Sequence, residues 1–156
     1  MLTGMRLRSA ASAVVACKWL GPKAPKVLGL VGIGSMGTAA LRCLTRMFQF
    51  EEIRCTSRRV ETRTAFAEKW SRETGVKVVT KESIEDVVRG ADIIVGGTTS
   101  GEIVSREPWV KPGATFISLA RRELGWEPKV PLADGGDPRV LPLPFDTVAD
   151  PVAFAD

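Results

Sequence analysis

Three glycines with the spacing G-x-G-x-x-G offer the clearest chemistry in the sequence. Gly32, Gly34 and Gly37 enclose Ser35 and Met36, follow a short apolar run and open a segment of helical periodicity. At such a strand-to-helix turn the first glycine permits the tight turn, the second admits a pyrophosphate and the third lets the helix approach the strand. The pattern therefore predicts a dinucleotide phosphate site at a helix N-terminus. A glycine-rich turn without a ligand is the alternative.

A second group of polar residues ends the next predicted strand, where dinucleotide-binding folds contact the adenosine ribose. An acidic residue there accepts a hydrogen bond from the 2′-hydroxyl of NAD. This sequence has Ser57, Arg58 and Arg59 at that position and no carboxylate among them. Hydroxyl and guanidinium groups suit a 2′-phosphate, so they favour NADP(H) over NAD(H). The alternative is that both arginines only solvate the start of the following helix, where cations oppose the helix dipole.

A third polar group follows the fourth predicted strand. Thr98, Thr99 and Ser100 would lie outside the carboxyl end of that strand, where ligands bind in open α/β sheets, and would line the nicotinamide side of the site. An ordinary polar loop is the other interpretation. Ser118 and the run 121–123 reach the same rim after the fifth strand, and there an Arg-Glu pair that serves only the fold is the alternative.

The composition contains no histidine and no tyrosine among 156 residues. This excludes Ser/His/Asp and Cys/His nucleophile systems, histidine-ligated zinc and a Tyr/Lys proton relay. We predict no metal site and assign no catalytic residue. Chemistry would have to come from the remaining polar side chains, the backbone or a cofactor.

Charge and cysteine usage limit the partners and the compartment. The net charge is +4, and the basic residues of the first 26 positions are spaced apart without interleaved aromatics, so we expect no nucleic-acid binding. Three unpaired cysteines suit a reducing compartment, which predicts a cytoplasmic protein. No apolar run approaches the roughly 20 residues of a membrane span.

The N-terminus has basic residues followed by the apolar run 10–17, as a signal or transit peptide would. The run is short, and Lys18 and Trp19 follow where a cleavage site would have small neutral residues. We predict instead a helix from Met5 to Leu20. The residues expected to pack it are Ala10, Val14, Cys17 and Trp19.

The remaining pattern alternates strands with helices. Strands are predicted over Val27–Gly32, Ile53–Thr56, Val76–Val79, Ala91–Gly96 and Ala114–Leu119, and helices over Ser35–Met47, Arg59–Glu73 and Ser83–Val88. The Ser35–Met47 helix would face inward with Ala39, Ala40, Cys43, Leu44 and Met47. The predicted fold is α/β: a Rossmann-type doubly wound, mostly parallel sheet with an N-terminal helix and an irregular C-terminal tail. The expected divisions are 1–22, 23–126 and the proline-rich 127–156, which has at most a short strand at Arg139–Leu143.

Several segments together resemble the ornithine cyclodeaminase/mu-crystallin family. These are LRSAASAVVACKWL, LGLVGIGSMG, GADIIVGGTTSGEIV and REPWVKPGATFISL, and the similarity covers about residues 2–126. The resemblance implies NAD(P)-dependent chemistry on amino acids or cyclic imines. It also implies that an arginine at the head of the N-terminal helix grips the substrate carboxylate, a role that falls on Arg8, with Arg6 as second choice. The alternative for Arg8 is a solvent-facing helix charge.

Two departures from the family narrow the expected activity. The family's cyclodeaminases have an aspartate after the fifth strand, and this sequence has none between Ile117 and Glu123. We therefore expect NADPH-linked hydride transfer on an imino or amino acid, of the ketimine reductase or amino-acid dehydrogenase type, rather than cyclodeamination. The family's substrate and dimerisation domain uses a long N-terminal half that this sequence does not include, so a homodimer stays an open expectation. The alternative function is a non-catalytic nucleotide-binding module or a truncated fragment without activity.

Overall fold

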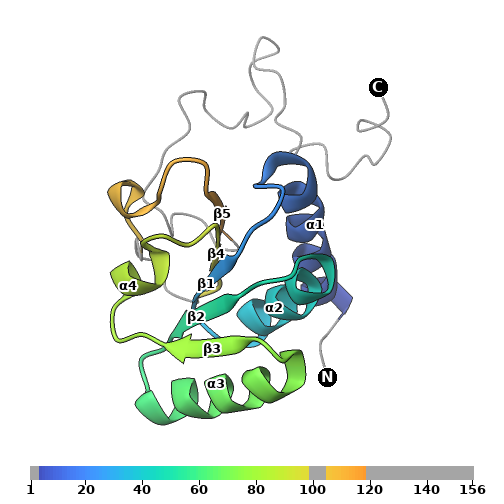
Figure 1. Cartoon of the computed structure of the whole chain (residues 1–156). Helices are drawn as coiled ribbons and strands as arrows, with labels where there is room; N and C mark the ends of the chain where they lie inside the picture. Colours follow the sequence, from blue (N-terminus) through green and yellow to red (C-terminus); the bar gives the residue numbers. More distant parts are fainter. Residues whose placement is uncertain (1–3, 99–104, 119–156) are drawn as a thin grey trace, which may run out of the picture. The chain divides into compact units, whose positions relative to one another are not determined.

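The computed structural model describes residues 4–98 and 105–118, which contain a five-stranded parallel sheet in the order β3-β2-β1-β4-β5 (Figure 1). The strands are β1 (Val27–Val31), β2 (Glu52–Thr56), β3 (Lys77–Thr80), β4 (Ile93–Gly96) and β5 (Thr115–Ser118). The helices are α1 (Gly4–Leu20), α2 (Ser35–Met47), α3 (Val60–Thr74), α4 (Ile84–Val88) and the short 3-10 helix η1 (Glu107–Trp109). The predicted Rossmann-type α/β fold is confirmed.

Alternating side chains of the central strands divide the core into two layers. Leu28 and Leu30 of β1 belong to one buried cluster, which is covered by α1, α2 and α3. Val31 of β1 and Ile94 of β4 belong to a second cluster, which is covered by α4. Figure 1 shows α4 on the side of the sheet opposite α1 and α2. Because both faces are covered, the central strands are apolar throughout, as parallel strands usually are.

The predicted elements agree closely with the observed ones, and the differences are at their ends. The helix Ser35–Met47 has the predicted bounds. The first strand ends at Val31 rather than Gly32, because Gly32 takes a positive φ of 91°. The third helix begins at Val60 rather than at Arg59, which is its N-cap residue. The predicted end of the fifth strand, Leu119, and the tail 127–156 with its strand at Arg139–Leu143 lie outside the described residues.

Two packing predictions were wrong. Trp19 is 76% exposed, because it lies about 200° around α1 from Cys17 and cannot share the face that buries Ala10, Val14 and Cys17. Met47 is 46% exposed, since it is the last residue of α2 and the chain turns away at Phe48. No helix in the described ranges has the length and apolarity that a bilayer span requires.

Asp92 joins three segments at the amino edge of the sheet. Its Oδ2 accepts hydrogen bonds from the backbone N–H groups of Lys26 and Val27, each at 2.8 Å. Its Oδ1 lies 2.6 Å from the Lys111 ammonium, just before β5. Burial of Asp92 would raise its pKa, but the Lys111 hydrogen bond and the two backbone donors outweigh this, so the pKa lies below its usual value. The carboxylate thereby fixes the start of β1 against β4 and β5.

Candidate functional site

The turn between β1 and α2 is built by three glycines in close contact. Gly32 has φ 91°, a conformation that side chains rarely adopt. A Cβ on Gly37 would lie 2.2 Å from the Gly32 carbonyl oxygen. A Cβ on Gly97, which follows β4, would lie 3.0 Å from the Gly37 backbone nitrogen. Glycine at these positions therefore allows the start of α2 to sit against the ends of β1 and β4.

Gly34 differs from its neighbours because nothing in the described residues requires it to be a glycine. Its φ of −67° suits any residue, and a Cβ there would meet no atom of residues 4–98 and 105–118 within 4 Å. Gly34 is the N-cap of α2 and makes no side-chain capping hydrogen bond. Ser35 is exposed and Met36 half-buried in the first turn. No described atom therefore fills the space beside Gly34, and the backbone there carries no Cβ at the point where a phosphate would approach.

The order of the strands places this turn at the topological switch point, where the chain stops adding strands on one side of β1 and continues on the other side with β4. Val31 pairs with Thr56 of β2 on one side and with Gly96 of β4 on the other. The loops after β1 and β4 therefore flank one crevice at the carboxyl edge, which is the ligand site of open α/β sheets. The Thr98 side chain lies at this crevice, since its Cγ2 would be 3.0 Å from a Cβ on Gly32.

Other residues predicted for this rim are only partly described. Ser118 ends β5 in register with Gly96 and is exposed, so it reaches the same edge. Thr99, Ser100 and the run 121–123 lie outside the described residues. The nicotinamide side of the predicted site is therefore represented by Thr98.

The three residues predicted to contact the ribose follow the end of β2. Ser57 is half-buried, whereas Arg58 and Arg59 are exposed. Arg59 is the N-cap of α3 and provides no side-chain capping hydrogen bond. The first carboxylate after them is Glu61, in the first turn of α3 and exposed. Two guanidinium groups are thus presented to solvent beside the crevice.

Arg8 lies on the exposed side of α1, away from the buried residues of that helix. The end of α1 lies at the amino edge of the sheet, because a Cβ on Gly21 would be 3.1 Å from Thr115 Oγ1 at the start of β5. Arg8 lies about 20 Å from Gly21 along the helix axis. This distance exceeds the length of β5, which is about 13 Å, so the helix passes the whole height of the sheet between Gly21 and Arg8. Since α1 runs antiparallel to β1 (Figure 1), Arg8 lies at the level of the carboxyl edge.

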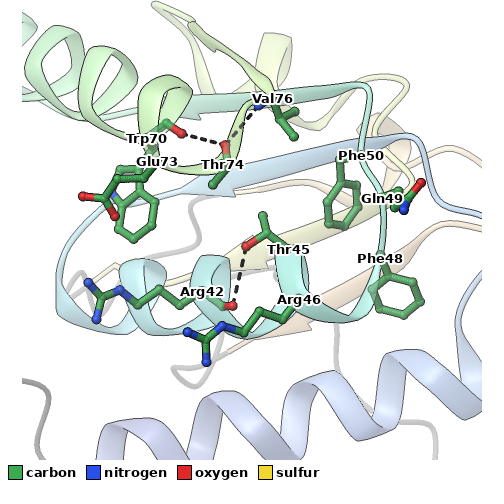
Figure 2. Close-up of a pocket in the computed structure, with 10 residues that line it drawn as sticks. All are labelled: Arg42, Thr45, Arg46, Phe48, Gln49, Phe50, Trp70, Glu73, Thr74 and Val76. Atoms are coloured by element: carbon green, nitrogen blue, oxygen red, sulfur yellow. Dashed lines mark hydrogen bonds between the residues drawn. The ribbon is translucent and has the colours of Figure 1, made fainter.

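A hollow of about 660 Å³ lies elsewhere in the described part of the chain. It is lined by the last turns of α2 and α3 and by residues 48–50 and Val76, which precede β2 and β3. Figure 2 shows Arg42 and Arg46 extending from α2 along this hollow, and the Arg42 guanidinium lies 5.4 Å from the Trp70 ring centroid. The hollow is at the amino edge of the sheet and does not belong to the crevice at Gly34.

One site residue was missed by reasoning from the sequence. Gly97 is not among the predicted site residues, but its close approach to Gly37 shows that it sets the spacing between β4 and α2. The Gly96-Gly97 doublet directly after a buried strand was the available indication, because glycine beside a strand often marks close backbone approach.

A parallel sheet with this strand order and a glycine turn at its topological switch point defines a Rossmann-type nucleotide-binding domain. The sequence profile of the ornithine cyclodeaminase/mu-crystallin family matches residues 1–128. The chain belongs to this family.

Relatives in sequence and structure agree with this assignment. Ketimine reductase mu-crystallin of Rattus norvegicus is 31% identical over 119 residues, which are 76% of this chain and 37% of that protein. The Δ1-pyrroline-2-carboxylate reductase of Thermococcus litoralis, solved with NADH and L-proline, has a TM-score of 0.70 at 26% identity, covering 73% of this chain and 35% of that one. The iminosuccinate reductase of Paracoccus denitrificans, solved with NAD+, has a TM-score of 0.59 at 29% identity, over 68% and 32% of the two chains. This chain therefore spans about a third of the length of these relatives.

Proposed function

We propose that this chain binds a nicotinamide dinucleotide, with NADP(H) preferred over NAD(H), and serves hydride transfer on an imino or amino acid. The observation that carries the proposal is the contrast among the glycines of the turn. The backbone around Gly32 and Gly37 requires glycine at both positions, whereas no part of the chain that the structure describes requires it at Gly34. A ligand approaching the N-terminus of α2 accounts for that difference.

The residues of the crevice fit such a cofactor. The backbone at Gly34, Ser35 and Met36 would hold the pyrophosphate at the positive end of the α2 dipole. Thr98, with Thr99 and Ser100 beyond it, would orient the nicotinamide. When bound, the cofactor supplies the hydride, while the protein supplies position and electrostatics. We assign this role to residues 23–126.

The preference for NADP(H) rests on Ser57, Arg58 and Arg59. Both guanidiniums are exposed beside the crevice, where they are accessible to a dianionic phosphate. A 2′-phosphate forms charge-assisted hydrogen bonds with arginine, whereas a 2′-hydroxyl does not need two cations. Related structures contain NADH or NAD+. The proposed preference for NADP(H) therefore rests on the residues Ser57–Arg59 of this chain and not on those structures.

The substrate class follows from the relatives and from Arg8. Relatives are named as reductases of ketimines, pyrroline-2-carboxylate and iminosuccinate. A C=N carbon next to a carboxylate is common to the last two, and arginine is the preferred partner for a carboxylate. We assign the carboxylate contact to Arg8, at the level of the carboxyl edge.

The cofactor preference is tested by titrating the chain with NADPH and with NADH. We expect tighter binding of NADPH, and we expect Arg58→Ala and Arg59→Ala each to reduce the difference. Arg46→Ala, which removes an exposed arginine at the amino edge, is the matched control and should leave the difference unchanged. Equal affinities for the two cofactors in the unaltered chain would contradict the preference.

The enzymatic activity is tested by NADPH oxidation with a panel of cyclic ketimines and of keto acids plus amines. Turnover that falls strongly in Arg8→Ala supports hydride transfer with Arg8 as the carboxylate anchor. Tight NADPH binding without turnover on any substrate would instead favour a nucleotide-binding module. Turnover that is unchanged in Arg8→Ala would remove the role assigned to that residue.

A further inference from the structure

Arg63 of α3 has a guanidinium that is largely buried but weakly paired. Its side chain is only 12% exposed, and its Nη2 lies 3.9 Å from Oε1 of Glu82. The Glu82 side chain is 92% exposed. Within the described ranges no closer carboxylate pairs with Arg63. A buried charge normally has close, hydrogen-bonded partners, because its desolvation is costly. A long contact to a solvated carboxylate compensates little of that cost.

The position of Arg63 follows from the face of α3 on which it lies. It is three, four and seven residues before the buried Phe66, Ala67 and Trp70, so it shares their inward face. Its backbone N–H donates to the Arg59 carbonyl at 3.2 Å. Arg63 therefore lies one helical turn after Arg59, which is one of the residues predicted to contact the ribose. The guanidinium is therefore near the start of α3 and directed toward the sheet.

Two neighbours show which part of the sheet the guanidinium meets. Burial raises the pKa of Cys55 to about 11, and the charge of Arg63 acts against that rise. Cys55 is the second-last residue of β2, and Glu82 follows closely after the end of β3. Arg63 thus lies between the carboxyl ends of β2 and β3, beside the segment Ser57–Arg59. Figure 1 shows the start of α3 next to the arrowhead of β3.

We propose that Arg63 is a third cation of the ribose-phosphate site, which exchanges its weak contact with Glu82 for the 2′-phosphate of the cofactor. This inference rests on the proposed NADP(H) preference and adds a specificity-determining residue to it. A dianionic phosphate can accept charge-assisted hydrogen bonds from the guanidinium that a carboxylate at 3.9 Å does not. Arg58 and Arg59 would contact the phosphate from the solvent side, and Arg63 from the side of the helix.

The test compares adenosine 2′,5′-bisphosphate with 5′-AMP as calorimetric probes of the whole chain. We expect Arg63→Gln to weaken binding of the bisphosphate by about tenfold or more, with binding of 5′-AMP nearly unchanged. Arg72→Gln is the control, because Arg72 is exposed in the last turn of the same helix. It should alter binding of neither probe.

A second variant keeps the test decisive if Arg63→Gln folds poorly. Glu82→Gln removes only the exposed partner, and we expect it to strengthen bisphosphate binding by about threefold. Unchanged bisphosphate affinity in both variants, or equal losses for both probes in Arg63→Gln, would overturn the role of Arg63. If Arg58→Ala still reduces the NADPH preference in that case, the proposed function stands. An unaltered chain that binds NADPH no better than NADH would overturn the proposed preference itself.

Discussion

The Gly37 α-carbon faces the carbonyl oxygen of Gly32 so closely that a Cβ on Gly37 would lie 2.2 Å from that oxygen. Real Cβ atoms essentially never approach a backbone oxygen this closely, so any side chain would force α2 away from β1. Because a Cβ on Gly97 would lie 3.0 Å from the Gly37 backbone nitrogen, such a shift would also disturb the contact between α2 and the end of β4. The third glycine of the motif is therefore a packing requirement of the fold.

Gly37→Ala should destabilise the chain, because the methyl group overlaps backbone that cannot rotate away. Overpacking of this kind costs about 3 kcal/mol at its upper range, which would lower the melting temperature by about 10 °C. Thermal unfolding followed by circular dichroism measures the change. Gly4→Ala is the control, since a Cβ on Gly4 would meet no atom within 4 Å. A Gly37→Ala melting curve equal to that of the control would contradict the packing argument.

Asp92→Asn should destabilise the chain at neutral pH by about 2 kcal/mol, since it removes the charge from three hydrogen bonds. The folded-state pKa of Asp92 is lowered, so its contribution is fully present above the unfolded value near pH 4. It is lost as the pH falls through the lower folded-state pKa. Denaturant unfolding between pH 2 and pH 7 should therefore show a shallower acid dependence in the variant.

Glu51→Gln provides the comparison for Asp92. The Lys26–Glu51 ion pair is 2.6 Å long, but both side chains are about two-thirds exposed, at 64% and 68%. Exposed pairs contribute little, so this variant should unfold like the unaltered chain. Equal destabilisation by the two substitutions would show that Asp92 has no special structural role.

Ser105→Ala should stabilise the chain. Ser105 is 1% exposed, and its hydroxyl has no hydrogen-bond partner among the residues that the structure describes. Removing a buried hydroxyl that is desolvated and unpaired should gain about 1 kcal/mol. Ser83→Ala is the matched substitution of opposite sign, because Ser83 Oγ accepts from the Asp86 N–H at 3.0 Å as the N-cap of α4 and should cost about 1 kcal/mol. Destabilisation in both variants would indicate that Ser105 is hydrogen-bonded in solution.

The sequence was sufficient to predict the sheet class and most elements, because periodicity and turn residues are local properties. Ser35–Met47 was predicted with its observed bounds for this reason. Trp19 was misplaced because the predicted face combined residues that point in different directions from the helix axis. The role of Asp92 could not be predicted, since its partners are far away in the sequence and come together only when the sheet has formed.

The same distinction applies to the candidate site. The glycine turn and the segment Ser57–Arg59 were identified because their residue types match their places after predicted strands. Gly97 and Arg63 were not, because their significance depends on a neighbour in the folded chain: Gly37 for the first, and the poorly paired Glu82 for the second.

The dinucleotide site at Gly34 is tested most directly by a calorimetric titration of NADPH into the unaltered chain and into Gly34→Ala, with both melting temperatures recorded. A Cβ on Gly34 would meet none of the described atoms, so the variant should melt like the unaltered chain. It should nevertheless bind NADPH at least about tenfold more weakly, because the methyl group occupies the approach of the pyrophosphate. Unchanged NADPH affinity in Gly34→Ala, or no binding to the unaltered chain, would contradict a dinucleotide site at this turn.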